Sequence, residues 1–237
     1  HGFSLGWLAR RLDLSAQRRG GLIISGATAW SSGLAVALHK LDVPVMVADN
    51  AWHRLRKARL GGVPVFFGEL LSEHAENALE LGAYGSLLAA TNNDAYNALV
   101  CAHYAPELGR QQVFQLAADE MAEQRRPSPA ARGRTALTDA LQYEDLQRAW
   151  YQGWSFHSTG LTDAFGLEQF QATLPAEAMP VLVVGANKQV RMMEAGKPLK
   201  AAPGERVLWF GCKAACAQEA PEETPAARVA EKPRPLV

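Results

Sequence analysis

The sequence predicts an α/β fold with a parallel sheet, because short apolar runs alternate with segments of helical periodicity. The first apolar run, residues 22–24, stops at Ser25-Gly26, and apolar residues then recur at helical spacing over residues 30–41. A second apolar run, residues 43–48, follows directly. A strand, a glycine turn, a helix and a further strand in this order are typical of the start of a parallel sheet.

The same alternation continues as far as residue 118. We expect further strands at 63–67, 87–90 and 113–116, and helices at 52–60, 72–81 and 95–104. Right-handed crossovers between these strands predict the order 3-2-1-4-5, with the first strand in the middle. The carboxyl ends of parallel strands then meet at one edge of the sheet, where open α/β sheets bind ligands.

The turn after the first strand carries an incomplete nucleotide-binding fingerprint. Aligned on Gly26, the pattern G-x-G-x-x-G has Thr28 at its second glycine and Ser31 at its third. Thr28 limits how closely a diphosphate can approach, whereas Ser31 is small enough for close packing and can donate its hydroxyl. Asp49 ends the second strand at about the 20-residue distance that suits a ribose-binding carboxylate. We expect Asp49 at a strand tip, outside the core, where it also disfavours a 2′-phosphate.

These features predict a Rossmann-like doubly wound parallel sheet over residues 21–118, followed by a smaller α+β domain over residues 137–211. Between them, residues 119–136 are rich in Arg and Pro and read as a surface linker. The smaller domain combines helices at 137–150 and 167–174 with short strands that predict an antiparallel sheet. Residues 212–237 lack hydrophobic periodicity and are predicted to be a disordered tail.

Composition narrows the classes of function. A formal net charge of zero gives no general attraction to nucleic acid, and 48% hydrophobic residues in 237 are enough for a full core. The cysteines, Cys101, Cys212 and Cys216, fit a reducing compartment rather than a disulfide framework. The sequence has no G-x-S-x-G elbow, P-loop or H-E-x-x-H motif, so we predict neither catalytic nor metal-binding residues.

Five segments carry a resemblance to a known family. They read GATAW at 26–30, PVMVAD at 44–49, KARLGGVPV at 57–65, GELLSEH at 68–74 and LAATNNDAYNAL at 88–99. These segments resemble the RCK (TrkA-N type) domain at the cytosolic end of bacterial NhaP-type sodium:proton antiporters. Residues 1–12 are similar to the segment that follows the last transmembrane helix in such antiporters, so residues 1–20 are predicted to be a post-membrane connection. Their mixed apolar and basic composition also fits a helix that packs on its own domain.

The resemblance implies a regulatory, non-enzymatic domain on the cytoplasmic face of the inner membrane. Its partners would be the transmembrane antiporter domain of the same chain and a second copy in a homodimer. It also implies a bound adenine nucleotide, AMP or similar, with NAD as a further possibility. Carried over by position, the binding residues are Gly26, Ala27, Thr28, Ser31, Asp49, Asn50, Gly68, Glu69, Thr91, Asn92, Asn93 and Asp94.

Two other functions stay open. One is a dimerisation module whose Rossmann cleft is empty. The other is an NAD-dependent oxidoreductase, which would need a proton-transfer residue, and His157 is the candidate. The basic stretch at residues 53–59 has two interpretations as well: a solvated helix face, or electrostatic support for a phosphate near Asp49.

Overall fold

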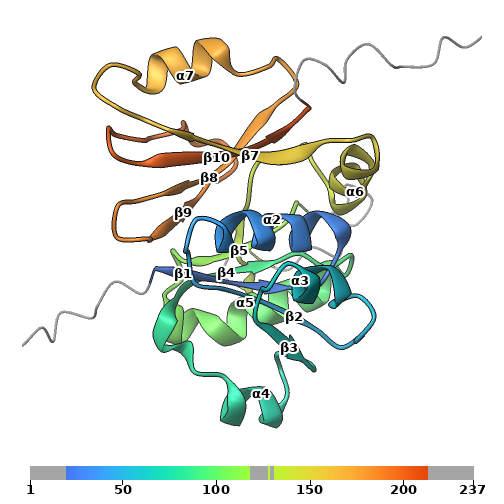
Figure 1. Ribbon diagram of the computed structural model, residues 1–237. Helices are drawn as coiled ribbons and strands as arrows, with labels where there is room; N and C mark the ends of the chain where they lie inside the picture. The colour runs from blue at the N-terminus through green and yellow to red at the C-terminus, as the bar shows by residue number, and fades with distance from the viewer. Residues whose placement is uncertain (1–19, 118–127, 129–130, 213–237) are drawn as a thin grey trace, which may run out of the picture.

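The computed structural model describes residues 20–117, 128 and 131–212 of the chain. The predicted post-membrane segment up to residue 19, the tail after residue 212 and most of the predicted linker therefore lie outside the described residues. The described chain forms two sheets (Figure 1): a six-stranded sheet in the order β3-β2-β1-β4-β5-β6 and a four-stranded sheet in the order β7-β10-β8-β9.

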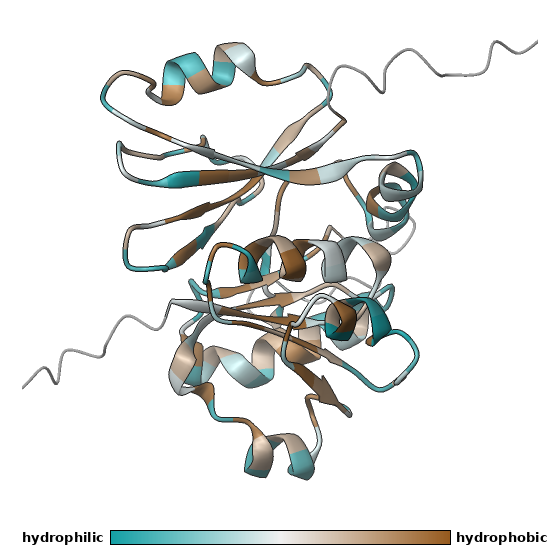
Figure 2. Ribbon diagram, in the orientation of Figure 1, coloured by the Kyte–Doolittle hydropathy of each residue, from teal (hydrophilic) through white to brown (hydrophobic). Residues whose placement is uncertain are grey.

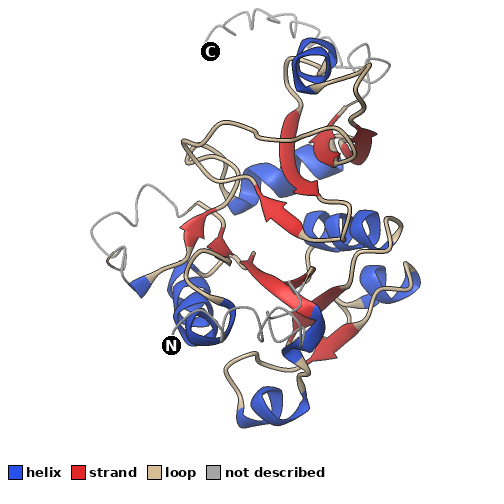
Figure 3. Ribbon diagram, turned by 90° about the vertical axis from the view of Figure 1, so that its left-hand side faces the viewer, coloured by secondary structure: helices blue, strands red, loops and turns tan. Residues whose placement is uncertain are grey.

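The first sheet confirms the predicted parallel order and adds one strand. Its strands are β1 (Gly21–Ser25), β2 (Val45–Asp49), β3 (Val65–Phe67), β4 (Tyr84–Ala89), β5 (Val113–Gln115) and β6 (Arg134–Thr135), and every pairing is parallel. The helices between them are α2 (Ala29–His39), α3 (Arg56–Leu60), α4 (Glu73–Ala78), the 3-10 turn η1 (Leu81–Ala83) and α5 (Asp94–Leu108). Helices cover both faces, as Figure 3 shows from the side.

Strand β6 falls within the stretch that the sequence predicted as a linker. It extends the sheet beside β5, where Thr135 pairs with Gln115. The preceding Gly133 donates its amide to the side chain of Gln115 at 2.9 Å, and Arg134 forms an ion pair with Glu194 of the second domain. These contacts make the end of the predicted linker part of the sheet.

Several element boundaries differ from the prediction. Helix α3 begins at Arg56 rather than at residue 52, because residues 52–55 form turns. Helix α4 ends at Ala78, since Leu79 is already extended. Helix α5 continues past Pro106 to Leu108 and ends at Gly109, whose φ of 92° is in the region that favours glycine.

The second sheet is antiparallel, as predicted. It consists of β7 (Ser155–Gly160), β8 (Met179–Val184), β9 (Val190–Met192) and β10 (Arg206–Gly211), and the two helices of this domain are α6 (Tyr143–Tyr151) and α7 (Leu167–Thr173). Helix α7 lies on the outer face of this sheet, and α2 lies against the inner one (Figure 1).

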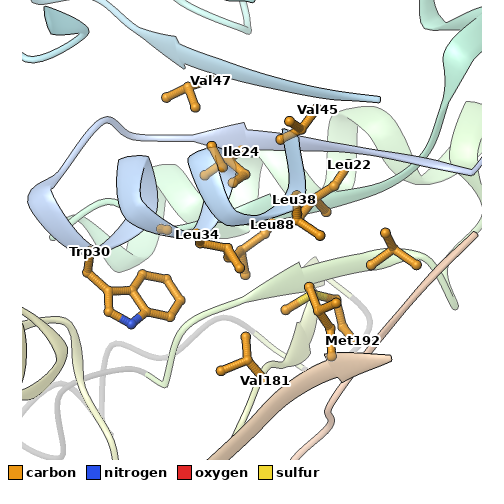
Figure 4. Packing of buried hydrophobic residues seen from close by; sticks show 14 of the residues in the cluster. Leu22, Ile24, Trp30, Leu34, Leu38, Val45, Val47, Leu88, Val181 and Met192 are labelled. Atoms are coloured by element: carbon orange, nitrogen blue, oxygen red, sulfur yellow. The ribbon is translucent and has the colours of Figure 1, made fainter. Parts of the chain in front are cut away.

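Helix α2 is therefore enclosed between the two sheets. Its apolar side chains Trp30, Leu34 and Leu38 are completely buried. Figure 4 shows them between Leu22 and Ile24 on one side and Val181 and Met192 on the other. Apolar residues of both domains thus share one cluster around α2, and the brown colour in Figure 2 follows the strands on both sides of this helix.

The strands alternate their side chains between two cores, as a pleated strand requires. On β1, Leu22 and Ile24 face α2, whereas Ile23 belongs to the cluster formed with Val100 and Tyr104 of α5. A third, smaller cluster lies under α7 and contains Phe170.

Close approach of α6 to α2 depends on one glycine. A Cβ built on Gly33 would lie 2.4 Å from Cζ3 of Trp150. The Trp150 ring is itself held against Phe210 of β10, with ring centroids 6.3 Å apart and an interplanar angle of 3°. The ring therefore has little freedom to move away.

The described chain begins at the seam between the two domains. The carbonyl of Gly20 accepts a hydrogen bond from the amide of Val190 at 3.1 Å, just before β1 enters the first sheet. A Cβ on Gly20 would lie 2.7 Å from the carbonyl oxygen of Lys188. The Lys188 ammonium in turn donates to the carbonyl of Leu41, after α2, at 2.7 Å.

Gly33→Ala should destabilise the protein by about 1–3 kcal/mol, the usual cost of overpacking a core. Alanine has the higher helix propensity, by about 1 kcal/mol, so a net loss of stability can come only from the collision with Trp150. Urea denaturation measures the change. Gly82→Ala is the control, because a Cβ at Gly82 meets no atom within 4 Å. Equal stabilities of the Gly33 variant and the wild type would contradict the tight α2–α6 contact.

Candidate functional site

The carboxyl ends of the parallel strands surround a small polar cavity of about 210 Å³. We call it the strand-end cavity. It is lined by Ser25, Gly26, Asp49, Asn50, Arg54, Gly68, Glu69, Thr91, Asn92, Asn93 and Tyr96. The structure thus brings together residues that the sequence predicted from four separate loops, and adds Ser25, Arg54 and Tyr96. Ser31 and Asp94, also predicted as binding residues, line neither this cavity nor the one described below.

Gly26 brings the turn after β1 against the end of β4. Its φ is +99°, and a Cβ there would lie 2.8 Å from Cγ2 of Thr91 and 2.9 Å from the carbonyl oxygen of Ala90. Thr91 is fixed in turn by the buried Asn97, whose Oδ1 accepts from the Thr91 amide at 3.1 Å and from its hydroxyl at 2.6 Å. The two walls of the cavity are therefore held in place before any ligand enters.

Asp49 lies at the predicted position in the fold, but its side chain is less exposed than we expected. Its side chain is buried, with the residue 8% exposed, and both of its oxygens accept hydrogen bonds from the protein. Oδ2 accepts from the amide of Ala27 and Oδ1 from the amide of Ala51, each at 2.8 Å. Asp49 ends β2, so the expected strand-tip position is confirmed, whereas the expectation that it lies outside the buried interior is wrong: its carboxylate braces the glycine turn. A carboxylate has about four acceptor positions, so it can still accept from a ribose hydroxyl.

The first turn of α2 is capped by its own side chains. The Thr28 amide donates to Oγ of Ser31 at 2.8 Å, and the Ser31 amide donates to Oγ1 of Thr28 at 3.0 Å. Ser31 is completely buried, and its hydroxyl donates to the carbonyl of Gly26 at 2.7 Å. The expectation that this hydroxyl serves a ligand is therefore wrong. Amides that would face a diphosphate in a complete fingerprint are already bonded within the protein.

A second, larger cavity of about 590 Å³ lies between the start of α2, α3 and α6. We call it the basic cavity. Its lining residues are Ala27, Thr28, Ala29, His53, Arg54, Arg56, Lys57, Leu60, Tyr143, Gln147 and Tyr151. Figure 1 shows α3 and α6 on either side of one end of α2. The Gln147 side chain donates to Oγ1 of Thr28 at 2.9 Å and joins α6 to the glycine turn.

The residues of α6 could not be found from the sequence. Gln147 and Thr28 are 119 positions apart, and no spacing rule links them. The basic residues could be found from the sequence, because Arg54, Arg56 and Lys57 lie in one basic stretch. We interpreted that stretch as either a solvated helix face or electrostatic support for a phosphate. The structure places these three at a cavity wall, while Arg59 lies over the exposed Trp52 ring with Cζ 3.9 Å from the centroid.

Charge differs sharply between the two cavities. The strand-end cavity has the carboxylates of Asp49 and Glu69 with Arg54, whereas none of the described residues that line the basic cavity is acidic. Burial raises the pKa of the Tyr96 hydroxyl, and its hydrogen bond to Glu69 raises it further. Arg54 lines both cavities and forms the boundary between them.

Lys57 is held in place by two contacts. Its ammonium donates to the carbonyl of Ala29 at 2.9 Å and lies 3.3 Å from the ring centroid of Trp150. Burial lowers the pKa of Lys57 to about 8, because the charged form loses part of its hydration. An anion in the basic cavity would stabilise the charged form of Lys57, and an apolar group there would destabilise it further.

Three further possibilities were a catalytic histidine, a metal site and a membrane-spanning helix. His157 lies on β7 against the Trp209 ring, at a centroid distance of 4.4 Å, and lines neither cavity. In the described part of the chain, no group of three or more His, Cys, Asp or Glu side chains is placed to hold a metal ion. None of the helices in residues 20–117 and 131–212 is both long enough and apolar enough to cross a membrane.

The parallel sheet and the strand-end cavity define the class: a Rossmann-like domain with a small polar cavity at the carboxyl edge of its sheet. Residues 22–125 match the family model of the TrkA-N domain. The match covers the part of the chain that forms β1 to β5, and the second sheet lies outside it. No protein of curated function matches the sequence.

The solved structures that are similar to the chain include the following three. The NAD(P)-binding domain of an exopolyphosphatase-related protein from Archaeoglobus fulgidus is 13% identical, with a TM-score of 0.42, over 57% of this chain and 96% of that one. The GsuK RCK domain is 13% identical, with a TM-score of 0.41, over 81% of this chain and 44% of that one. The GsuK channel bound to NAD is 16% identical, with a TM-score of 0.40, over 88% of this chain and 41% of that one. This chain therefore spans less than half the length of the GsuK chains.

Lys57 should make the free energy of unfolding rise between pH 8 and its ordinary pKa of 10.5. In this window the unfolded chain holds a proton on Lys57 that the folded protein has largely released, so increasing pH favours the folded state. Lys57→Met should lack this part of the rise. The titratable and charged groups around the cavity, His53, Arg54, Arg56, Tyr143 and Tyr151, are the same in both proteins.

Urea denaturation at pH 7.5 and pH 10 measures this difference. Lys40→Met is the matched control, because Lys40 is an exposed lysine at the end of α2. The control should keep the pH dependence of the wild type. Identical pH dependence in the Lys57 variant and the wild type would show that Lys57 keeps an ordinary pKa.

Proposed function

We propose that this chain is a cytosolic regulatory domain that binds an adenine nucleotide and controls a monovalent cation:proton antiporter to which it is joined. The observation that carries the proposal is the strand-end cavity, where Gly26, Asp49, Glu69 and Thr91 meet at the carboxyl edge of a parallel sheet. The TrkA-N match over residues 22–125 supports a regulatory domain, and the resemblance of the loops to antiporter RCK domains supports the sodium:proton antiporter. On this proposal the chain acts at the cytoplasmic face of the inner membrane.

The chemistry of the strand-end cavity suits the adenosine part of a nucleotide. Asp49 and Glu69 can accept hydrogen bonds from ribose hydroxyls, and the polar residues at 91–93 can bond to the edge of a base. Two carboxylates repel a phosphate, so the base and the ribose are the groups that fit here. The cavity of about 210 Å³ is smaller than the roughly 300–1,000 Å³ of most cofactor sites. Its size favours AMP over NAD.

The proposed binding set keeps ten of the twelve predicted residues and divides their roles by position. The adenosine site would be lined by Gly26, Asp49, Asn50, Gly68, Glu69, Thr91, Asn92 and Asn93. Ala27 and Thr28, whose amides are already bonded within the protein, would lie beside the phosphate without donating these amides to it. Ser31 holds the turn from within, and Asp94 begins α5. The domain boundaries near residues 118, 136 and 211 stay part of the proposal.

A regulatory role fits the site better than an enzymatic one. The oxidoreductase alternative needs a proton donor beside the cofactor, and His157 contacts Trp209 and Ser155 in the second sheet instead. The alternative of an empty dimerisation module makes the opposite prediction for ligand binding, so calorimetry separates it from the proposal.

AMP should bind to the wild type, and Glu69→Gln should weaken this binding by roughly 10- to 100-fold, the usual effect of losing a charge-assisted hydrogen bond. Glu69 is the better test residue, because Asp49→Ala would also leave the amides of Ala27, which is buried, and Ala51 without acceptors. Isothermal titration calorimetry with AMP, ADP, ATP, NAD and NADH gives the affinities.

Glu80→Gln is the control for this measurement, since it removes an exposed carboxylate outside both cavities. It should bind AMP as the wild type does. If none of the five nucleotides binds to the wild type, the dimerisation module becomes the better explanation. Turnover of NADH with a carbonyl substrate would favour the oxidoreductase.

The chain should form a homodimer at concentrations on the order of micromolar, because α5 and β3 leave large apolar side chains in solvent. Leu99 is 60% exposed and Phe67 is 53% exposed. Light scattering should give twice the chain mass of 25.7 kDa. A mass that stays at one chain as the concentration rises would contradict the dimer.

A further inference from the structure

We propose that the basic cavity is an oligophosphate site, which takes a diphosphate or longer phosphate chain between α3 of the first domain and α6 of the second. The ligand is identified by charge and size, and its binding does not require that an adenosine group occupies the strand-end cavity.

The charge of the cavity is not neutralised by the protein. Arg54, Arg56 and Lys57 line it, and none of the described lining residues carries a carboxylate. The ion pairs found among the described residues involve other cations: His103, Arg134, Arg148, Lys188, Arg191 and Lys197. Arg54 also lines the strand-end cavity with its two carboxylates, so the uncompensated charge is that of the exposed Arg56 and the half-buried Lys57. Positive charge gathered in a concave place attracts anions.

Lys57 shows that this charge is held in position rather than free in solvent. Its ammonium is fixed by the Ala29 carbonyl at 2.9 Å and by the Trp150 ring, whose centroid is 3.3 Å away. Both contacts orient the side chain without neutralising its charge. A bound phosphate would supply the missing negative charge and restore the ordinary protonation of the lysine.

The wall contributed by α6 adds neutral donors. Tyr143, Gln147 and Tyr151 line the cavity opposite the cations. The Tyr143 hydroxyl is protonated at neutral pH and can donate a hydrogen bond, and burial moves its pKa still further above neutral. The Gln147 amide already donates to Oγ1 of Thr28, and this contact holds α6 against the turn. A ligand in the cavity would touch both domains.

Size and donor type favour an oligophosphate over a smaller anion. The cavity of about 590 Å³ lies in the range of roughly 300–1,000 Å³ of small-molecule sites, which a single carboxylate or chloride would leave mostly empty. Arg54 and Arg56 carry planar guanidinium groups, which bind phosphate oxygens in pairs. The neighbouring strand-end cavity contains two carboxylates and is unsuited to the same anion.

Calorimetry with sodium pyrophosphate in magnesium-free, low-salt buffer tests the proposal on the full chain. We expect saturable binding to the wild type. Lys57→Gln should weaken it by roughly 10- to 100-fold, and Lys57→Arg should keep it within a few-fold. Lys40→Gln removes an exposed lysine from the other end of α2 and should bind as the wild type does. No binding, or equal losses in Lys57→Gln and Lys40→Gln, would overturn the proposal.

A second measurement reports on Lys57 directly. NMR titration of the lysine side chains should show the Lys57 resonance titrating near pH 8 in the free protein and at a higher pH with pyrophosphate bound. An unchanged titration in the presence of saturating pyrophosphate would place the anion elsewhere and overturn the proposal. Circular dichroism of each variant checks that the fold is kept.

Competition distinguishes the two sources of the phosphate chain. Pyrophosphate binding that ATP abolishes, and that AMP weakens less because AMP carries a single phosphate, would assign the cavity to the phosphate tail of a nucleotide. Binding unaffected by either nucleotide would assign it to a free oligophosphate; both results support an oligophosphate site. Because pyrophosphate lacks adenosine, its failure to bind would count against the basic cavity alone, and failure of AMP against the proposed function alone.

Discussion

The enclosure of α2 between two sheets is the constraint on which the rest of the structure depends. A helix beside a parallel sheet usually turns one face to water, but α2 meets β1 on one side and β8 and β9 on the other. Its large apolar residues, Trp30 and Leu34, fill both contacts, and Gly33 admits a ring from α6. Close packing of this kind tolerates little displacement. The turn before α2, and with it both cavities, is held from two sides.

The parts of the fold that could be predicted from the sequence are those with local signals. The apolar runs at residues 22–24 and 43–48, each followed by turn residues, predicted β1 and β2. The right-handed preference of crossover connections then predicted the order of the strands. Strand β6 had no such signal, because Arg134 and Thr135 are polar and their pairing depends on the neighbouring edge of β5. The contact between α6 and the glycine turn is equally invisible, since it joins two domains.

The site could be predicted in position and not in detail. Loops after parallel strands must meet at one edge, so Gly26, Asp49, Glu69 and Thr91 were placed together correctly. Which atoms remain available is decided by tertiary contacts. Asp49 is used to hold the turn, and the α2 cap closes on itself through Thr28. The glycine pattern at Gly26 predicts which edge of the sheet carries the cavities. The separation of the acidic strand-end cavity from the basic cavity depends on the packing of α3 and α6, which the sequence does not reveal.

The position of Gly20 has a mechanical consequence. Its carbonyl is bonded to the amide of Val190 in the second sheet, and directly after it the chain becomes β1, the middle strand of the first. Lys188, packed beside it, reaches the loop after α2. A force applied to the chain at Gly20 would therefore act on both domains at once, at the seam between them. It would not move one domain relative to the other. The two domains would respond to such a force as one rigid body.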